Sequence, residues 1–171
     1  MHPIPRKPAP DLSFDLVDGE RWTLQDQSPG HFTLVIFYRG YHCPLCRQQL
    51  QGYEELFDRF SALGVEVVAV STNDQDIATK TKSEWKLPKI PIGHGLSLDT
   101  VRDWGLWISS ARKDNEPDRF NEPGLFLVRP DGTLYFASIQ SMPFSRASAE
   151  QLLNSIEWII ENDYPARGEV E

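Results

Sequence analysis

The stretch FTLVIFYRGYHCPLC, residues 32–46, decides the fold of this chain. It opens with an unbroken apolar run over residues 32–38, which is typical of a buried strand. It closes on a C-x-x-C motif formed by Cys43 and Cys46. Apolar residues then recur at spacings of three and four up to residue 63, which predicts a helix with one buried face. A C-x-x-C motif between a strand and a helix indicates a thiol–disulfide site.

The predicted helix N-terminus sets the chemistry of the two thiols. The positive end of a helix dipole favours the thiolate, and thiols in this motif have pKa values lowered to roughly 3.5–7.5. Pro44 suits the first helical position, where its missing N–H costs nothing. That placement puts Cys43 at the N-cap, better placed for solvent, and Cys46 one turn further in. On local geometry we expect Cys43 to be the nucleophile toward disulfides.

Two other interpretations of the cysteine pair are open. The thiols can serve as small apolar side chains in a core, or as half of a zinc site. A zinc site needs four ligands, and the sequence has no second C-x-x-C motif. Thiol–disulfide chemistry needs neither a metal nor an organic cofactor, so we predict neither.

Length and composition set the broad class of the protein. A chain of 171 residues with 40% hydrophobic residues is most simply one domain with a full core. The net charge of −8 argues against general affinity for nucleic acid or an anionic membrane. There is no apolar run long enough for a membrane span and no apolar region typical of a secretory signal near the N-terminus. Two cysteines are too few for a structural disulfide framework, so we predict a reducing, cytoplasmic location.

The pattern outside the motif predicts alternating strands and helices. The helix after the motif is expected over 44–63, with Gly64 as its cap. The other expected elements are a β-hairpin over 11–24 around Asp18-Gly19, a strand over 65–71, a helix over 74–85, a short edge strand over 87–92, a short helix over 97–104, a charged loop over 109–122, a hairpin over 124–138 around Asp131-Gly132 and a last helix over 148–161. This order predicts an α/β fold, a mixed central sheet with helices on both faces.

Several segments carry a resemblance to a known family. The element order with C-x-x-C at the first helix is similar to the thioredoxin fold. The segments 9–12, 35–38, 64–71 and 124–128, in that order, resemble the peroxiredoxin branch, the alkyl hydroperoxide reductase and thiol-specific antioxidant proteins. The resemblance implies that residues 1–171 form a single thioredoxin-like domain of peroxiredoxin type, with an N-terminal β-hairpin extension.

The active-site signature of that family, P-x-x-x-T-x-x-C, does not carry over cleanly. In its register Arg39 stands in place of the proline, Cys43 in place of the threonine, and Cys46 in place of the peroxide-attacking cysteine. The family's later arginine, which helps to bind peroxide, corresponds to Pro123. The remaining pattern, C-x-x-C with a proline just before a strand, resembles thioredoxin. In thioredoxins that proline is cis and lies against the disulfide, so the resemblance predicts a cis Pro123.

The resemblance implies thiol-dependent reduction of hydroperoxides through a Cys43/Cys46 dithiol–disulfide cycle. The family register would make Cys46 the attacking cysteine and Cys43 the resolving one, so the order of the two stays open. The implied partners are a hydroperoxide substrate, a thioredoxin- or glutaredoxin-type reductant and a second copy in a homodimer. Two alternatives remain: a protein thiol–disulfide oxidoreductase without peroxidase activity, which the lost threonine and arginine favour, and a redox-responsive binding module.

Two side chains before the motif are candidate supporting residues. A guanidinium at Arg39 can stabilise a thiolate and orient a peroxide oxygen in place of the missing arginine; a surface salt bridge is the alternative. His42 can lower a neighbouring thiol pKa as imidazolium or shuttle a proton as the neutral ring; a solvent-facing loop residue is the alternative. The segment 142–146 reads as an exposed loop, to which we assign no mechanism.

Overall fold

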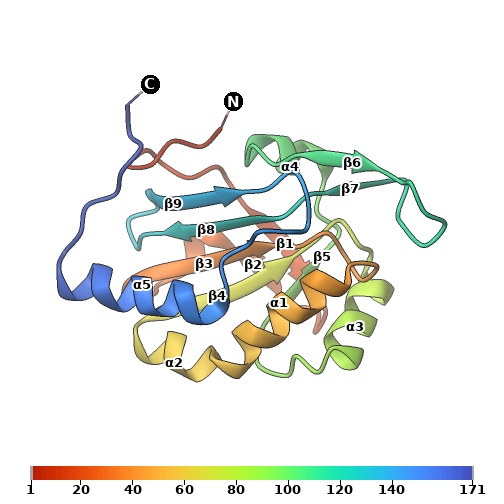
Figure 1. Ribbon diagram of the computed structural model, residues 1–171, viewed down its shortest axis with the longest axis horizontal. Helices are drawn as coiled ribbons and strands as arrows, with labels where there is room; N and C mark the ends of the chain where they lie inside the picture. The colour runs from red at the N-terminus through yellow and green to blue at the C-terminus, as the bar shows by residue number, and fades with distance from the viewer. Residues whose placement is uncertain (1, 171) are drawn as a thin grey trace.

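The protein is described by a computed structural model over residues 2–170. A seven-stranded mixed sheet forms its centre, with strand order β2-β1-β5-β4-β3-β8-β9 (Figure 1). The elements, in chain order, are β1 (Ser13–Leu16), β2 (Arg21–Thr23), the 3₁₀ helix η1 (Leu24–Asp26), β3 (Phe32–Phe37), α1 (Pro44–Glu55), α2 (Phe57–Ala62), β4 (Val65–Val70), α3 (Gln75–Glu84), β5 (Ile92–His94), α4 (Leu98–Asp103), β6 (Ile108–Ser110), β7 (Arg119–Asn121), β8 (Gly124–Val128), β9 (Leu134–Ile139) and α5 (Ala149–Glu161).

Strand β3, the apolar run before the motif, is an inner strand of the sheet, between β4 and β8. It pairs in parallel with β4 and antiparallel with β8, and all six of its residues are buried. Because side chains alternate across a strand, Leu34 and Ile36 join one core cluster and Val35 and Phe37 join the other. This confirms the buried central strand and the parallel β3–α1–β4 unit expected from the sequence.

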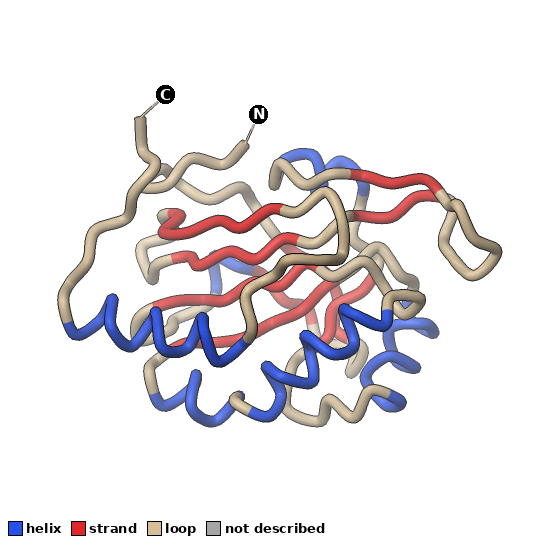
Figure 2. Tube along the Cα trace, viewed as in Figure 1, coloured by secondary structure: helices blue, strands red, loops and turns tan. Residues whose placement is uncertain are grey.

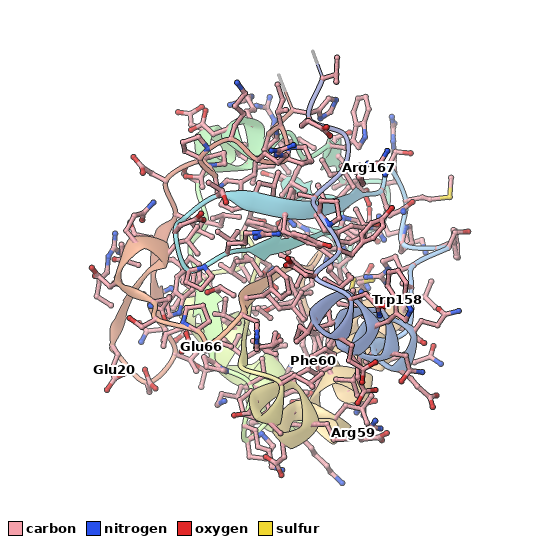
Figure 3. All side chains as sticks on the ribbon, turned by 90° about the vertical axis from the view of Figure 1, so that its left-hand side faces the viewer. Glu20, Arg59, Phe60, Glu66, Trp158 and Arg167 are labelled. Atoms are coloured by element: carbon pink, nitrogen blue, oxygen red, sulfur yellow. The ribbon has the colours of Figure 1, made fainter. Side chains whose placement is uncertain are left out.

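Helices cover both faces of the sheet, as predicted, but unequally. Helices α1, α2, α3 and α5 lie along one face (Figure 2), over the cluster that contains both cysteines. On the other face Val101 and Trp104, from α4 and its C-cap, pack with the hairpin β1–β2. Phe60 of α2 is buried, whereas Trp158 of α5 is 52% exposed; both are labelled in Figure 3.

Several local predictions are confirmed by capping and turn geometry. Asp74 and Ser148 cap α3 and α5 through their side chains, as side-chain oxygens do at helix N-termini. Gly64 has φ +72°, the left-handed conformation that ends a helix before a strand. The hairpins β1–β2 and β8–β9 form around the predicted turns.

The single helix expected over 44–63 is wrong, because the chain breaks at Leu56. Its φ and ψ of −99° and 7° separate α1 from α2. A continuous helix of that length would extend about 30 Å, whereas a strand of six residues spans about 20 Å. The break lets α2 turn back so that Phe60 packs against the sheet.

Two further predictions need correction. The expected edge strand over 87–92 is instead β5, an inner strand that pairs with β4 and β1. Pro88 and Pro91 both precede it, so they cost it no ladder hydrogen bonds. The charged loop over 109–122 contributes strands β6 and β7, which pair with each other outside the main sheet. Only Phe120 of this segment gives an apolar signal, too little for an alternation to be read.

Candidate active site

A fixed loop carries the chain from β3 to the dithiol. Gly40 has φ +132°, and a Cβ added there would lie 2.8 Å from Oδ1 of Asn73. The same Asn73 oxygen accepts a hydrogen bond from the backbone N–H of Tyr41 at 2.8 Å. The N–H of Cys43 donates to the carbonyl oxygen of Gly40 at 3.1 Å. Close packing at Gly40 therefore sets where α1 begins.

The two cysteines occupy the first turn of α1 as predicted. Cys43 is the N-cap, its sulfur accepts the N–H of Cys46 at 3.2 Å, and Pro44 is the first helical residue. Both thiols are free. The expectation that Cys43 faces solvent is wrong: it is 1% exposed and Cys46 is 0% exposed. The Cys43 side chain turns back into the core cluster that also holds Tyr38 and Cys46.

The pair is electrostatically asymmetric. The pKa of Cys43 is lowered to about 6, mainly by a hydrogen bond from the Cys46 thiol. Burial acts in the opposite direction, whereas a hydrogen bond from the Cys46 backbone N–H lowers the pKa further. The charges of Arg146 and Arg39 add smaller lowering contributions. Burial raises the pKa of Cys46 well above its ordinary value, and its hydrogen bond to Cys43 and the charge of Cys43 act in the same direction. At neutral pH Cys43 is therefore the thiolate and Cys46 the thiol.

Arg39 lies beside the site, but its charge is paired. Its Nε is 3.0 Å from Oε2 of Glu122, and its Nη2 donates to Oε1 at 3.3 Å. Glu122 is 2% exposed and also accepts a hydrogen bond from Ser109 at 2.6 Å. The guanidinium stacks over Phe120 at 4.9 Å. The pair is thus enclosed, unlike the surface salt bridge considered as an alternative.

His42 packs its ring edge against Phe120, with centroids 4.7 Å apart. Both ring nitrogens are buried and lack a hydrogen-bond partner among residues 2–170. Burial, and then the nearby Arg39, lower the pKa of His42. The neutral ring is therefore the form at neutral pH, which disfavours the predicted imidazolium role.

The prediction of a cis Pro123 is wrong, since no peptide bond in the described part of the chain is cis. The N–H of Glu122 donates to the carbonyl of Trp107 at 2.8 Å, and the carbonyl of Pro123 accepts from the N–H of Gln140 at 3.0 Å. These bonds hold the chain on an extended path from β7 into β8. Pro123 lines a cavity of about 20 Å³ together with Gln49 and Arg146.

Arg146 is the site residue that sequence reasoning missed. It lies in the segment between β9 and α5, and its Nη1 is 3.6 Å from Sγ of Cys46. Nη1 also donates to Oε1 of Gln49 at 2.5 Å, and Nε donates to the carbonyl of Pro143 at 2.8 Å. One hundred residues separate it from Cys46, and no local pattern marks it. Only the approach of this segment to α1 reveals the contact.

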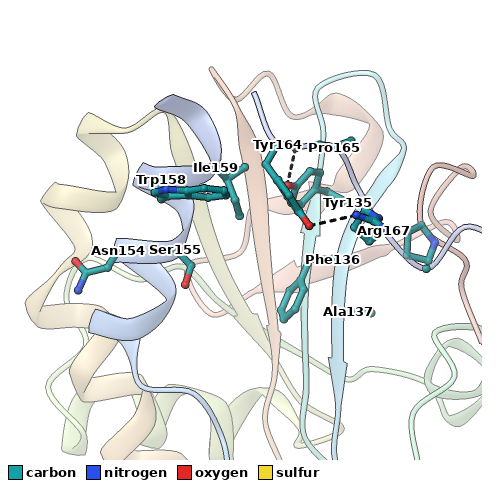
Figure 4. Close-up of a pocket in the computed structure, with 12 residues that line it drawn as sticks. Tyr135, Phe136, Ala137, Asn154, Ser155, Trp158, Ile159, Tyr164, Pro165 and Arg167 are labelled. Atoms are coloured by element: carbon teal, nitrogen blue, oxygen red, sulfur yellow. Dashed lines mark hydrogen bonds between the residues drawn. The ribbon is translucent and has the colours of Figure 1, made fainter. Parts of the chain in front are cut away.

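Two larger surface cavities are not lined by either cysteine. A groove of about 580 Å³ runs along α1, from Leu45 to Glu55, and is closed on its other side by the segment Pro143–Ala149. A second cavity of about 740 Å³ lies between β9, α5 and the C-terminal segment (Figure 4). Within residues 2–170 there is no cluster of three or more His, Cys, Asp or Glu side chains arranged to hold a metal. No helix described there has the length and apolar character needed to cross a membrane.

Comparison with known proteins adds independent findings. The model of the AhpC/TSA family matches residues 5–137. A putative peroxiredoxin, ycf42, of Pyropia yezoensis is 26% identical over 155 residues, covering 88% of this chain and 77% of its own length. Peroxiredoxin TSA1-B of Candida albicans is 26% identical over 162 residues, covering 89% and 78%.

Solved structures show the same fold. Peroxidoxin BcpB of Mycobacterium tuberculosis superposes with a TM-score of 0.75 at 16% identity, over 92% of this chain and 99% of its own. Reduced Prx3 of Vibrio vulnificus, solved in complex with H₂O₂, superposes with a TM-score of 0.75 at 15% identity, over 89% and 97%. The sheet and helices described above are therefore arranged as in these proteins.

Proposed function

Because the chain belongs to the AhpC/TSA family of thiol-dependent peroxidases, we propose that it reduces hydroperoxides with Cys43 as the attacking thiolate and Cys46 as the resolving thiol. The observation that carries this order is the N-cap geometry of Cys43. Its sulfur accepts hydrogen bonds from the Cys46 backbone and thiol, and its pKa is lowered. The thiolate is the nucleophilic form of cysteine, so local geometry outweighs the family register in choosing between the two.

The first step is attack on the peroxide. The Cys43 thiolate bonds to one peroxide oxygen, the O–O bond breaks, and the other oxygen leaves as an alkoxide or hydroxide that takes up a proton. Cys43 is then a sulfenic acid. The neutral ring of His42 adjoins the thiolate in sequence and has buried, unpartnered nitrogens, which supports the proton-shuttle role for it.

The second and third steps return the enzyme to its starting state. Cys46 attacks the sulfur of the sulfenic acid, forms the Cys43–Cys46 disulfide and releases water. An external dithiol of thioredoxin or glutaredoxin type then reduces this disulfide by exchange, supplying two electrons. Such a reductant fits the reducing, cytoplasmic location predicted from the cysteine count, and the whole cycle fits within a single domain.

The decisive test is the second-order rate at which H₂O₂ oxidises the reduced protein, followed by tryptophan fluorescence or thiol loss. We expect a rate orders of magnitude above that of a free thiol. Cys43→Ser should not react, and Cys46→Ser should react once and stop at the sulfenic acid. A reactive Cys43→Ser variant that stops at the sulfenic acid would reverse the assignment of the two cysteines.

A second candidate function is thiol–disulfide exchange with proteins. The C-x-x-C pair occupies the positions of the family's threonine and attacking cysteine, and this substitution is what favours exchange. Insulin reduction by a dithiol donor distinguishes the two: an oxidoreductase accelerates it and leaves peroxide unconsumed. A redox-responsive binding module would oxidise once without turnover.

We also propose a homodimer formed through the edge of the sheet. Strand β9 pairs only with β8 among the described strands. The N-terminal segment covers the start of its outer edge, because Leu134 exchanges backbone hydrogen bonds with Arg6 and Lys7. Beyond Leu134 the outer edge has no strand partner within residues 2–170. Trp158, Phe136 and Tyr164 are partly exposed and line the adjoining cavity (Figure 4). An open edge and an apolar patch on one surface are complementary to a second copy related by a two-fold axis.

A further inference from the structure

The most distinctive charge near the dithiol is that of Arg146. Its guanidinium contacts Cys46, not Cys43, and two further hydrogen bonds, to Gln49 and to the carbonyl of Pro143, hold it in place. Within residues 2–170 no carboxylate lies at ion-pair distance from it. A positive charge without a carboxylate partner is thus fixed against a buried thiol.

The other arginine of the site differs in this respect. Arg39 forms an ion pair with Glu122, in which Nε is 3.0 Å from Oε2 and Nη2 is 3.3 Å from Oε1. A neighbouring carboxylate cancels most of the field that a guanidinium exerts on a third group. Of the two arginines, Arg146 is therefore the one that combines a contact to a cysteine sulfur with a charge that no carboxylate within residues 2–170 neutralises.

The charge on Arg146 matters most after Cys43 has been oxidised. In the reduced pair, burial, the hydrogen bond to Cys43 and the Cys43 charge all hold Cys46 in the thiol form, and Arg146 opposes them. Conversion of the Cys43 thiolate to a neutral sulfenic acid removes the charge of Cys43 and the hydrogen bond that the Cys46 thiol made to it. The contact with Arg146 does not depend on the state of Cys43, and charge-assisted contacts of this kind are the strong ones.

We propose that Arg146 stabilises Cys46 as a thiolate during resolution, so that disulfide formation outruns further oxidation of Cys43. In this step Cys46 loses its proton and attacks the sulfur of the sulfenic acid. The S–S bond forms, the S–O bond breaks, and the departing hydroxide combines with that proton to give water. This inference rests on the proposed function, in which Cys43 attacks.

Stopped-flow fluorescence separates the two steps, because the first depends on peroxide concentration and the second does not. The variants are Arg146→Gln, which removes the charge, and Arg146→Lys, which keeps it. Arg59→Gln, at an exposed position on α2, is the control for loss of one positive charge. A sulfenic-acid trap and mass spectrometry follow the fate of Cys43, and the pH dependence of the second phase reports the ionisation of Cys46.

We expect Arg146→Gln to slow the second phase by roughly ten- to a hundredfold, to move its pH midpoint upward and to increase sulfinic acid at Cys43. Arg146→Lys should restore part of the rate, and Arg59→Gln should match the wild type. A second phase unchanged in Arg146→Gln, or a first phase slowed as much as the second, would overturn the inference while leaving the cycle intact. A Cys46→Ser protein that forms no sulfenic acid with peroxide would instead overturn the proposed function itself.

Discussion

Arg39 and Glu122 form an almost enclosed ion pair beside the dithiol, with Nε 3.0 Å from Oε2. Eighty-three residues separate them in the chain, so the pair joins the loop after β3 to the segment between β7 and β8. One of these segments contains His42 and the other contains Phe120, and the two rings pack against each other. The Arg39 guanidinium also lies over the Phe120 ring.

Removing one charge of this pair should destabilise the protein strongly. In Glu122→Gln the Arg39 guanidinium is left without a charged partner in a buried setting, which costs about 3 kcal/mol. Chemical denaturation of the reduced protein measures the change in unfolding free energy. Asp58→Asn is the matched control, because it breaks the exposed pair with Lys89; exposed pairs contribute about 0–1 kcal/mol. Equal effects of the two variants would contradict the enclosed pair.

The rate of peroxide attack should depend on pH through Cys43. Its folded pKa of about 6 lies below the value of an ordinary thiol, so the thiolate fraction, and with it the rate, rises with pH and levels off above about pH 7. Below the midpoint the rate should fall about tenfold per pH unit. Single-turnover oxidation between pH 4.5 and 9, with thiolate absorbance as a second readout, tests this.

The Cys46→Ala variant tests the cause of that pKa. It removes the thiol donor that contributes most to lowering the pKa of Cys43, while the backbone N–H at 3.2 Å remains. We expect the pH midpoint of the first oxidation step to move upward. A midpoint near that of a free thiol in the wild type would show that the N-cap arrangement does not activate Cys43. No change in Cys46→Ala would show that the Cys46 thiol is not the cause of the lowered pKa.

The sequence predicted what is local in this site and failed on what is distant. The N-cap position of Cys43, the role of Pro44 and the left-handed Gly64 after the helix depend on neighbours within four residues, and all three are present. The contact of Arg146 with Cys46 joins residues 100 positions apart, and that of Arg39 with Glu122 joins residues 83 positions apart. Burial of Cys43 likewise depends on how α1 meets the sheet, which no periodicity encodes.

Substitution of Gly40 should disturb the loop that carries the dithiol. Gly40→Ala places a Cβ 2.8 Å from the Asn73 side chain and imposes a left-handed φ of +132° on alanine; we expect a loss of about 2 kcal/mol in stability. Gly19→Ala has the same kind of φ but open space around its Cβ, so it should cost about 1 kcal/mol. The difference between the two isolates the contact with Asn73.

Activity separates these glycine variants further. Displacement of Asn73 would break its hydrogen bond to Tyr41 and move the start of α1. Gly40→Ala should therefore lower the peroxide rate at temperatures where it is fully folded, whereas Gly19→Ala, in the β1–β2 turn, should keep the wild-type rate. Equal activity of both variants would show that the loop tolerates displacement of Asn73.

The edge of β9 should govern assembly. Trp158 is 52% exposed beside that edge, and its ring lies 5.4 Å from that of Tyr164. If a second copy covers this surface, Trp158→Arg should shift the protein from dimer to monomer in sedimentation velocity, because a charge buried in an apolar interface is costly. Trp107→Arg is the matched control, since Trp107 is equally exposed but lies outside the cavity of Figure 4. A wild-type protein that is monomeric at micromolar concentration would rule out this interface. A dimer that dissociates only in the Trp107→Arg variant would rule it out as well.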